Sequence, residues 1–181
     1  MLNPDIRPKV KNLIWRPLSH CLPTLAALYH RHVQINVFCP LCSSNVEDEY
    51  HVFVACSVAK SVWSMLNVAD LSSLFVSSFE FWNYIIRNKN KEDINMAAML
   101  FWTLWNNRNL KVWKDSCSPR LVLFNITITF FKEWNQAQAL WTNCKVSNTT
   151  MSDRWTPAAE GRIKCNINAA VSQIEIMLYM D

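Results

Sequence analysis

The chain contains one glycine, Gly161, among its 181 residues. Average usage of about 7% would give about 13 glycines in a chain of this length. Phosphate-cradling loops, dinucleotide-binding fingerprints and tight β-hairpins need glycine where φ is positive or where a ligand approaches the backbone closely. The scarcity therefore argues against the common nucleotide-binding enzyme classes and predicts a fold dominated by helices.

The charged residues are distributed unevenly along the chain. Residues 1–38 carry five Lys or Arg and a single Asp, and residues 39–56 carry three acids and no base. A basic N-terminal region is suited to binding nucleic acid through its phosphates. It is also typical of a solvated helix face, and composition alone favours that second interpretation.

The cellular compartment is inferred from two features of the sequence: it shows no signal-peptide core, and its number of cysteines is odd. The N-terminus has no apolar core of signal-peptide length, and no apolar run approaches the roughly 20 residues of a membrane-spanning helix. We therefore expect an intracellular protein, nuclear or cytoplasmic, that is not secreted and has no membrane partner. Seven cysteines, an odd number, argue against a disulfide framework and in favour of metal for those that cluster.

The hydrophobic spacing predicts a series of helices with few strands. Pro17 should kink or end the first of them near Arg16, and Thr24 should cap the second. The expected helices cover 6–22, 25–31, a stretch after Cys56, 77–87, a long one from Glu92 to about Val112, and 119–141. A polar linker over 146–160 and a short strand over 163–170 follow, and the apolar stretch 170–180 has no obvious partner.

For two of these segments the pattern allows a more detailed prediction: the buried face of the long helix, and the choice between helix and strand for residues 124–130. In the long helix, one apolar stripe is predicted, with four polar residues off it. The stripe is Ile94, Ala98, Phe101, Trp105 and Val112, and the residues off it are Asn106, Asn107, Arg108 and Lys111. Residues 124–130 alternate apolar and polar as a strand does, but a wider window keeps a helical interval, so helix is predicted there.

A cluster of metal-type ligands lies between residues 39 and 56. Cys39, Cys42, His51 and Cys56 supply three thiolates and an imidazole, which is the ligand set of a closed, structural zinc site. The alternative is a set of buried cysteines and a core histidine, which four residues at ligand spacing make the weaker interpretation. The acidic run 47–49 is expected to be the solvated start of the helix that carries His51.

No nucleophile and base stand at a recognisable catalytic spacing, and all four histidines lie in the first 51 residues. A structural role is expected for each histidine. Four cysteines outside the cluster are expected to be small core or surface residues. They are Cys21, Cys117, Cys144 and Cys165.

Several motifs in order resemble the reverse transcriptase zinc-binding domain of plant non-LTR (LINE-type) retroelements. They span about residues 5–66 and are Pro8-Lys-Val-Lys-Asn-Leu-Ile-Trp-Arg16, Leu22-Pro-Thr24, Cys39-Pro-Leu-Cys42, Glu47-Asp48, His51-Val-Phe53, Cys56 and Val62-Trp63. The segment from Phe101 to Asn109 is similar to the helix that follows in that family. The resemblance implies a zinc-binding module that helps a reverse transcriptase hold its RNA or its target.

Residues from Arg154 to Ala170 resemble the entry to a ribonuclease H domain. The family's first metal-binding aspartate falls on Asn168, whose amide cannot supply the charge that a two-magnesium site needs. The resemblance therefore implies a truncated ribonuclease H-like start. With no polymerase in the chain, we expect a protein that is not an enzyme and has no small-molecule substrate.

The predicted fold class is mainly α: a small zinc-knuckle helical module, two or three longer helices and a short C-terminal strand remnant. The predicted domains are 1–70, 71–145, a linker 146–160, and 161–181. The predicted function is nucleic-acid binding, stabilised by structural zinc, with phosphate contacts from Lys9, Lys11, Arg16 and Arg31. The alternatives are an inactive relic, a protein-interaction scaffold, or, from the family name alone, an RNA–DNA hybrid ribonuclease.

Overall fold

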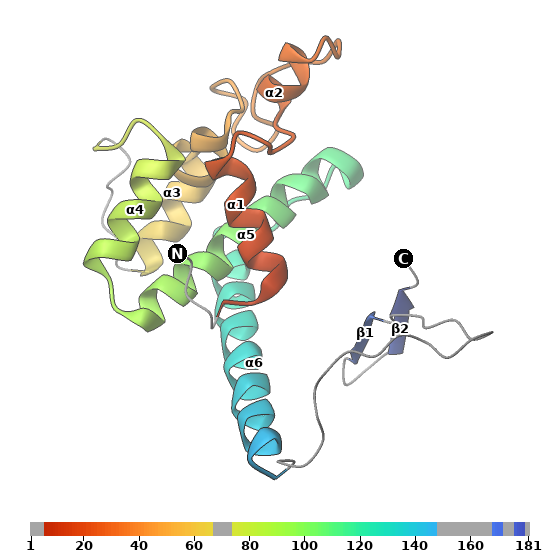
Figure 1. Cartoon of the computed structure of the whole chain (residues 1–181). Coiled ribbons are helices and arrows are strands. Elements are labelled where there is room, and N and C mark those ends of the chain that lie inside the picture. The colour runs from red at the N-terminus through yellow and green to blue at the C-terminus, as the bar shows by residue number, and fades with distance from the viewer. Residues whose placement is uncertain (1–5, 67–73, 148–167, 172–175, 180–181) are drawn as a thin grey trace, which may run out of the picture. The chain divides into compact units, whose positions relative to one another are not determined.

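A computed structural model describes residues 6–66, 74–147, 168–171 and 176–179, with side chains described for 6–66 and 74–140. Contacts divide the chain into two compact units, Met1–Trp141 and Thr142–Asp181. The helices of the first unit confirm the mainly helical fold class (Figure 1). They are α1 (Pro8–Leu18), α2 (Leu25–His30), the π-helical turn η1 (His51–Ala55), α3 (Ser57–Trp63), the 3₁₀ turn η2 (Ser64–Leu66), α4 (Ser78–Asn88), α5 (Lys91–Lys114) and α6 (Arg120–Ser147), which runs into the second unit.

The first helix runs past its expected stop. Helix α1 ends at Leu18 rather than near Arg16, and Pro17 lies inside its last turn with its ring buried. A proline this close to the end disturbs little of the helical hydrogen-bond ladder, and burial of the ring stabilises the position. Thr24 caps α2 as predicted, because its side chain accepts a hydrogen bond from the amide of Ala27.

In the described part of the chain, residues other than glycine take positive φ angles just after three of the helices. His20, His32 and Asp115, which follow α1, α2 and α5, have φ of 52°, 65° and 48°. Glycine is the usual residue at such positions, and another L-residue there costs about 1–2 kcal/mol. Polar residues with strained backbone thus stand at these helix ends, where glycine is usual.

The core of the first unit is built around Phe101 on α5. Its ring stacks on Phe53 of η1 at 4.6 Å between centroids and meets Trp82 of α4 edge-on at 5.3 Å. Trp63 of α3 lies 5.9 Å away, also edge-on. Helix α5 therefore joins the predicted segments 1–70 and 71–145 in one core.

The predicted single stripe on α5 is wrong at its C-terminal half. Phe101 and Trp105 are buried as predicted, but so are Asn107 and Arg108, whereas Val112 is 37% exposed. Helix α5 contacts α1, α4 and η1, and the hydroxyl of Thr127 on α6 reaches Thr103 at 3.1 Å. Because neighbours surround the helix, polar residues on its flanks are buried as well.

Residues 124–130 are helical, as the wider spacing predicted, and belong to α6. Leu123 and Thr127 are its buried residues among those whose side chains are described. The helix continues to Ser147, so residues 146–147 are not the linker that composition suggested; the linker's remaining residues, 148–160, lie outside the described part of the chain.

The second unit contains two antiparallel strands, β1 (Asn168–Val171) and β2 (Ile176–Tyr179), with Asn168 opposite Tyr179. The predicted strand 163–170 is thus present at its end, while 163–167 lie outside the described residues. The apolar stretch that had no evident partner pairs with this strand, because its Ile-Met-Leu-Tyr run can complete a hairpin ladder.

Among the described residues, no helix has the length and apolarity needed to cross a membrane.

Candidate metal centre

The four predicted zinc ligands come from three local structures. Cys39 and Cys42 lie on a tight turn flanked by the β-bridge between Phe38 and Val46. Within that turn the Cys39 amide donates to the carbonyl of Asn45 at 2.8 Å. His51 opens η1, and Cys56 directly precedes α3, so each ligand is held by regular hydrogen bonding close to it.

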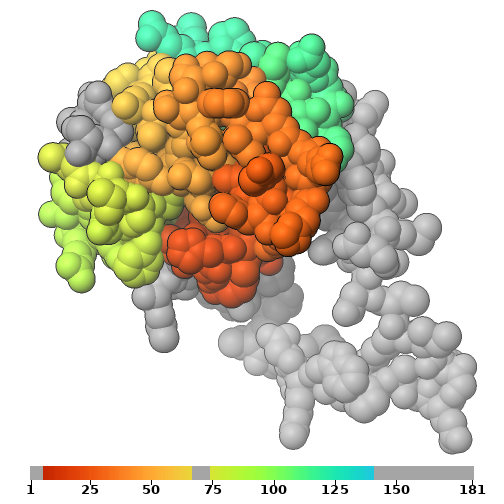
Figure 2. Space-filling model, turned by 90° about the horizontal axis from the view of Figure 1, so that it is seen from above, coloured from red at the N-terminus to blue at the C-terminus, as the bar shows by residue number. Residues whose placement is uncertain are grey.

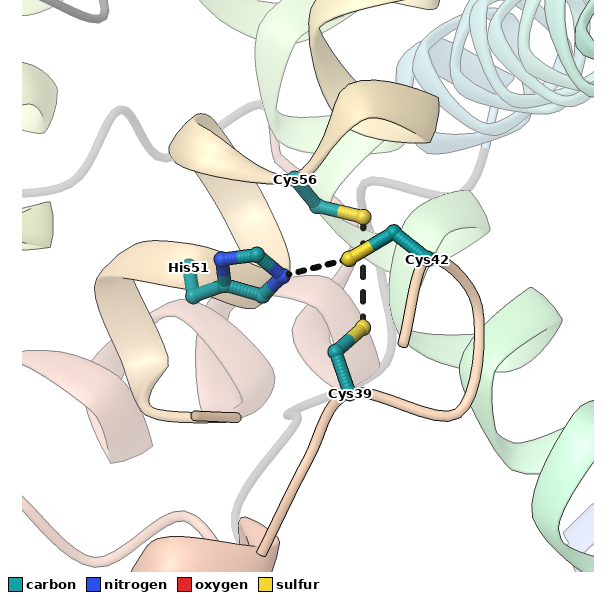
Figure 3. Close-up of side chains that lie close together, drawn as sticks. All are labelled: Cys39, Cys42, His51 and Cys56. Atoms are coloured by element: carbon teal, nitrogen blue, oxygen red, sulfur yellow. Dashed lines mark hydrogen bonds between the residues drawn. The ribbon is translucent and has the colours of Figure 1, made fainter. Parts of the chain in front are cut away.

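The ligand atoms converge on a single point (Figure 3). All four lie within 4.8 Å of one another, and Cys39, His51 and Cys56 are buried while Cys42 is half-buried. The sulfurs of Cys39 and Cys56 are 3.9 Å apart, and the Cys42 sulfur is 3.2 Å from Nε2 of His51. A tetrahedron with Zn–S bonds of about 2.3 Å has S···S edges of about 3.8 Å. The donor set and its spacing therefore fit zinc with little rearrangement.

The metal-free cluster shares its protons unequally. Hydrogen bonding to Cys56, together with burial, raises the pKa of the Cys39 thiol to about 12. The pKa of Cys56 is lowered by the hydrogen bond from Cys39 and by backbone amides at the start of α3. Hydrogen bonds to the thiols of Cys39 and Cys42 raise the pKa of His51. A metal ion that binds here must displace the protons that this arrangement retains.

The expectation of a solvated helix start over residues 47–49 is wrong for Glu47 and right for Asp48. Glu47 was expected at a solvated helix start, but it is fully buried. Its carboxylate accepts hydrogen bonds from the amide of Leu25 at 2.9 Å and from the Arg108 guanidinium at 3.0 and 3.1 Å. Asp48, which is exposed, accepts the amide of His51 at 2.6 Å and so fixes the start of η1.

The Glu47–Arg108 ion pair links the segment that carries the metal ligands, residues 39–56 (the metal loop), to α5. The Arg108 side chain is 5% exposed and its guanidinium lies 4.9 Å from the centre of the Trp105 ring. A planar guanidinium held by a carboxylate and a ring has little freedom, which suits a fixed structural contact. The two residues are 61 positions apart, so the sequence alone did not indicate that they form a pair. The only local signal was the positive charge of Arg108 within an apolar and aromatic helix.

The predicted phosphate-contacting residues are distributed over two helices. Lys9 and Arg16 are exposed on α1, and Lys11 is half-buried on the same helix. Arg31 is exposed at the end of α2. The three residues on α1 thus share one element, while Arg31 belongs to another.

Sequence reasoning missed an exposed aromatic residue among these bases. Trp15 is 57% exposed on α1, beside Arg16. The Arg16 Nε donates to Oδ1 of Asn12 at 3.2 Å, which holds the guanidinium along the helix surface. The sequence signal that could have identified Trp15 was its position off the apolar stripe of an amphipathic basic helix.

Comparison with known proteins supports zinc as the metal of this site. No curated protein and no solved structure matches the chain. A family model described as zinc-binding in reverse transcriptase matches residues 1–63, a segment that contains Cys39, Cys42, His51 and Cys56. The predicted zinc cofactor is confirmed by this match together with the convergent ligands. Residues 1–63 of the chain are therefore similar to the zinc-binding segment of reverse transcriptases.

Proposed function

We propose that this protein is a zinc-stabilised nucleic-acid-binding fragment derived from a retroelement reverse transcriptase, and that it works by binding rather than by catalysis. The observation that carries the proposal is the outward face of α1. That helix has no acidic residue, and it exposes Lys9, Trp15 and Arg16 to solvent while its other face is buried.

The chemistry of this face suits a single strand of RNA or DNA. Lysine and arginine neutralise phosphates, and an exposed indole offers a surface on which an unpaired base can stack. Asn12 holds the Arg16 guanidinium along the helix surface, and the preceding residue, Trp15, is exposed, so α1 presents both a charge and a ring to solvent. Bound zinc would cross-link the Cys39–Cys56 loop, and its chemistry here is structural because four protein ligands leave no open coordination position.

A neighbouring arginine is already engaged elsewhere. Arg7 lies over the rings of Phe130 and Trp134 on α6, at 4.8 and 5.9 Å from their centres. This contact fixes the start of α1 against α6 and occupies the Arg7 side chain. The proposed phosphate contacts are therefore those of Lys9, Lys11 and Arg16, with Arg31 as a further contact from α2.

Salt dependence of binding tests the proposal. The zinc-loaded protein should bind a labelled 12-nucleotide single-stranded RNA in fluorescence anisotropy, with affinity that falls steeply with salt. Loss of two phosphate contacts in the double variant Lys9→Glu/Arg16→Glu should lower the slope of log K against log salt by about 1.4. The matched control is Lys60→Glu/Arg87→Glu, which makes the same charge change at exposed positions of α3 and α4. Equal weakening by both double variants would contradict a specific role for α1.

The proposal of a non-catalytic protein is supported by Asn168. An amide at the position of a metal-binding carboxylate does not neutralise two magnesium ions. We expect no cleavage of an RNA–DNA hybrid by the purified chain with Mg²⁺ or Mn²⁺. Cleavage that persists in an independently purified batch would overturn this part of the proposal.

A protein-interaction scaffold is the second candidate, because α6 exposes adjacent apolar side chains. Leu121, Val122 and Ile126 are 59%, 43% and 43% exposed. Light scattering coupled to size-exclusion chromatography distinguishes the candidates. Self-association that Ile126→Lys abolishes, in a protein without salt-dependent RNA binding, would favour the scaffold.

A further inference from the structure

We propose that the turn after α2 forms a pocket for one unpaired nucleobase of a single-stranded nucleic acid, with Tyr29 as the stacking ring and Arg31 beside the adjoining phosphate. This inference rests on the proposed nucleic-acid binding and deepens it. It adds a second contact region, separate from α1, that reads bases rather than phosphates alone.

The pocket is a hollow of about 360 Å³ at the end of α2. Its lining residues are Tyr29, His30, His32, Val33 and Gln34. This volume lies near the lower end of the range for small-molecule sites, which suits a single base. The pocket therefore has the dimensions of one nucleotide unit rather than of a peptide groove.

Two rings shape one wall of the pocket. Tyr29 is 57% exposed, and its ring meets that of His30 edge-on with centroids 6.3 Å apart. The edge contact holds the tyrosine while leaving a face of its ring available. An exposed aromatic face of this kind binds bases by stacking and tolerates any sequence.

The electrostatic setting favours a polyanion. Residues 25–46 contain no Asp or Glu, and Arg31 is exposed between His30 and His32. Gln34 adds an amide that can both donate and accept at a base edge. A basic peptide is the weaker alternative, because residues 25–46 contain no acidic side chain that would select one.

His32 is present at a position where the backbone favours glycine. Its φ is 65°, its amide donates to Tyr29 at 2.9 Å, and the amide of Val33 donates to Leu28 at 3.1 Å. This hydrogen-bond pattern is the glycine-type end of a helix. Strained residues concentrate at ligand sites, and His32 lines the pocket. The chain therefore places an imidazole in the pocket at a position where glycine would be less strained.

Helix α1 and the segment that contains the pocket both reach one face of the molecule. Figure 2 shows the surfaces of α1, in red, and of residues 25–46, in orange, on the face seen from above. One strand of nucleic acid approaching this face meets both. The pocket would then select unpaired nucleotides from among those that the charges attract.

The test compares two 12-mers with the zinc-loaded full chain, one an oligouridylate and one a backbone of equal charge that lacks bases. The oligouridylate should bind more tightly. Tyr29→Ala should weaken its binding by about fivefold to about 150-fold and leave the abasic strand unaffected, as expected for one lost stacked base. Tyr29→Phe, which keeps the ring, should retain the affinity.

His32→Gly separates a binding role from a structural one. Glycine relieves the positive φ, so thermal stability should be maintained or raised, while affinity for the oligouridylate falls by about fivefold on loss of one hydrogen bond. The matched control is His20→Gly at the end of α1, where φ is 52° and the residue does not line the pocket. That control should keep both stability and affinity.

The outcomes distinguish this inference from the proposed function. If the α1 charge variants weaken binding but Tyr29→Ala and His32→Gly do not, the pocket inference fails and the proposed function stands. If neither 12-mer binds, the proposed function fails and the pocket inference fails with it. Equal weakening of both strands by Tyr29→Ala would show a structural effect and also overturn the inference.

Discussion

At the scale of single residues, Cys42 is the ligand that tests the metal centre most directly, because it is half-buried while Cys39 and Cys56 are buried in the core. We expect Cys42→Ser to lower the zinc content from one per chain to near zero and to lower the unfolding temperature. Metal analysis and thermal circular dichroism measure both quantities. Cys117→Ser, at an exposed free cysteine, is the control; a Cys42→Ser protein that keeps one tight zinc would contradict the ligand assignment.

Proton release on zinc binding is a second prediction for single residues. The Cys39 thiol, with its pKa raised to about 12, is protonated at neutral pH in the metal-free cluster. Zinc binds the thiolate, so binding releases at least one proton and the affinity rises as the pH rises. Titration calorimetry at pH 7 in two buffers of different ionisation enthalpy counts the protons. Release of none would show that Cys39 does not bind the metal.

Individual residues differed in how well the sequence pattern predicted them. The metal ligands were predictable because their spacing is local: Cys39 and Cys42 share one turn, and His51 and Cys56 lie at the two ends of η1. Glu47 was misassigned because its burial depends on Arg108, which is distant in sequence. A run of acids is ordinarily solvated, and only the fold shows that one of them has a buried cationic partner.

At the scale of elements, the Glu47–Arg108 pair is a buried charged contact between the metal loop and α5. Removing one member leaves the other charge buried without compensation, which typically costs about 3–5 kcal/mol. We expect Arg108→Met and Glu47→Gln each to lower the free energy of unfolding in urea by about this amount. The double variant should lose less than the sum, because it leaves no uncompensated charge.

The exposed pair between Lys111 and Asp115, at 2.7 Å on the same helix, is the control for that experiment. Solvent screens it, so Lys111→Ala should leave the urea midpoint unchanged. Strict additivity of the two buried substitutions would mean that Glu47 and Arg108 do not interact energetically.

Helix positions were more predictable than helix faces. Periodicity located α4 and α5, and correctly favoured helix over strand for residues 124–130. The orientation of α5 could not be derived from one stripe, because α1, α4 and η1 contact it from several sides. A helix surrounded by neighbours buries polar residues such as Asn107, whose Oδ1 accepts the Ser118 amide at 2.8 Å.

At the scale of the whole molecule, the matched segment and the folded core have different extents. The family model covers residues 1–63, whereas the core it contributes to includes α4, α5 and the start of α6. Phe53 lies close to the ligand His51 in sequence and stacks on Phe101, so the metal loop and α5 share a packed contact. The zinc site and the central helix should therefore gain and lose structure together.

Hydrogen exchange measured by mass spectrometry tests this coupling on the intact chain. A structural zinc contributes about 10–16 kcal/mol, which is comparable to the whole stability of a typical domain. Removing it with a strong chelator should therefore abolish amide protection in residues 101–108 of α5 as well as in α1 and α3. Residues 136–140 of α6, which are mostly exposed, serve as an internal reference and should change little. Loss of protection restricted to residues 6–66 would show instead that the metal loop unfolds alone, and that Phe101 and Arg108 stay ordered without their partners across the core.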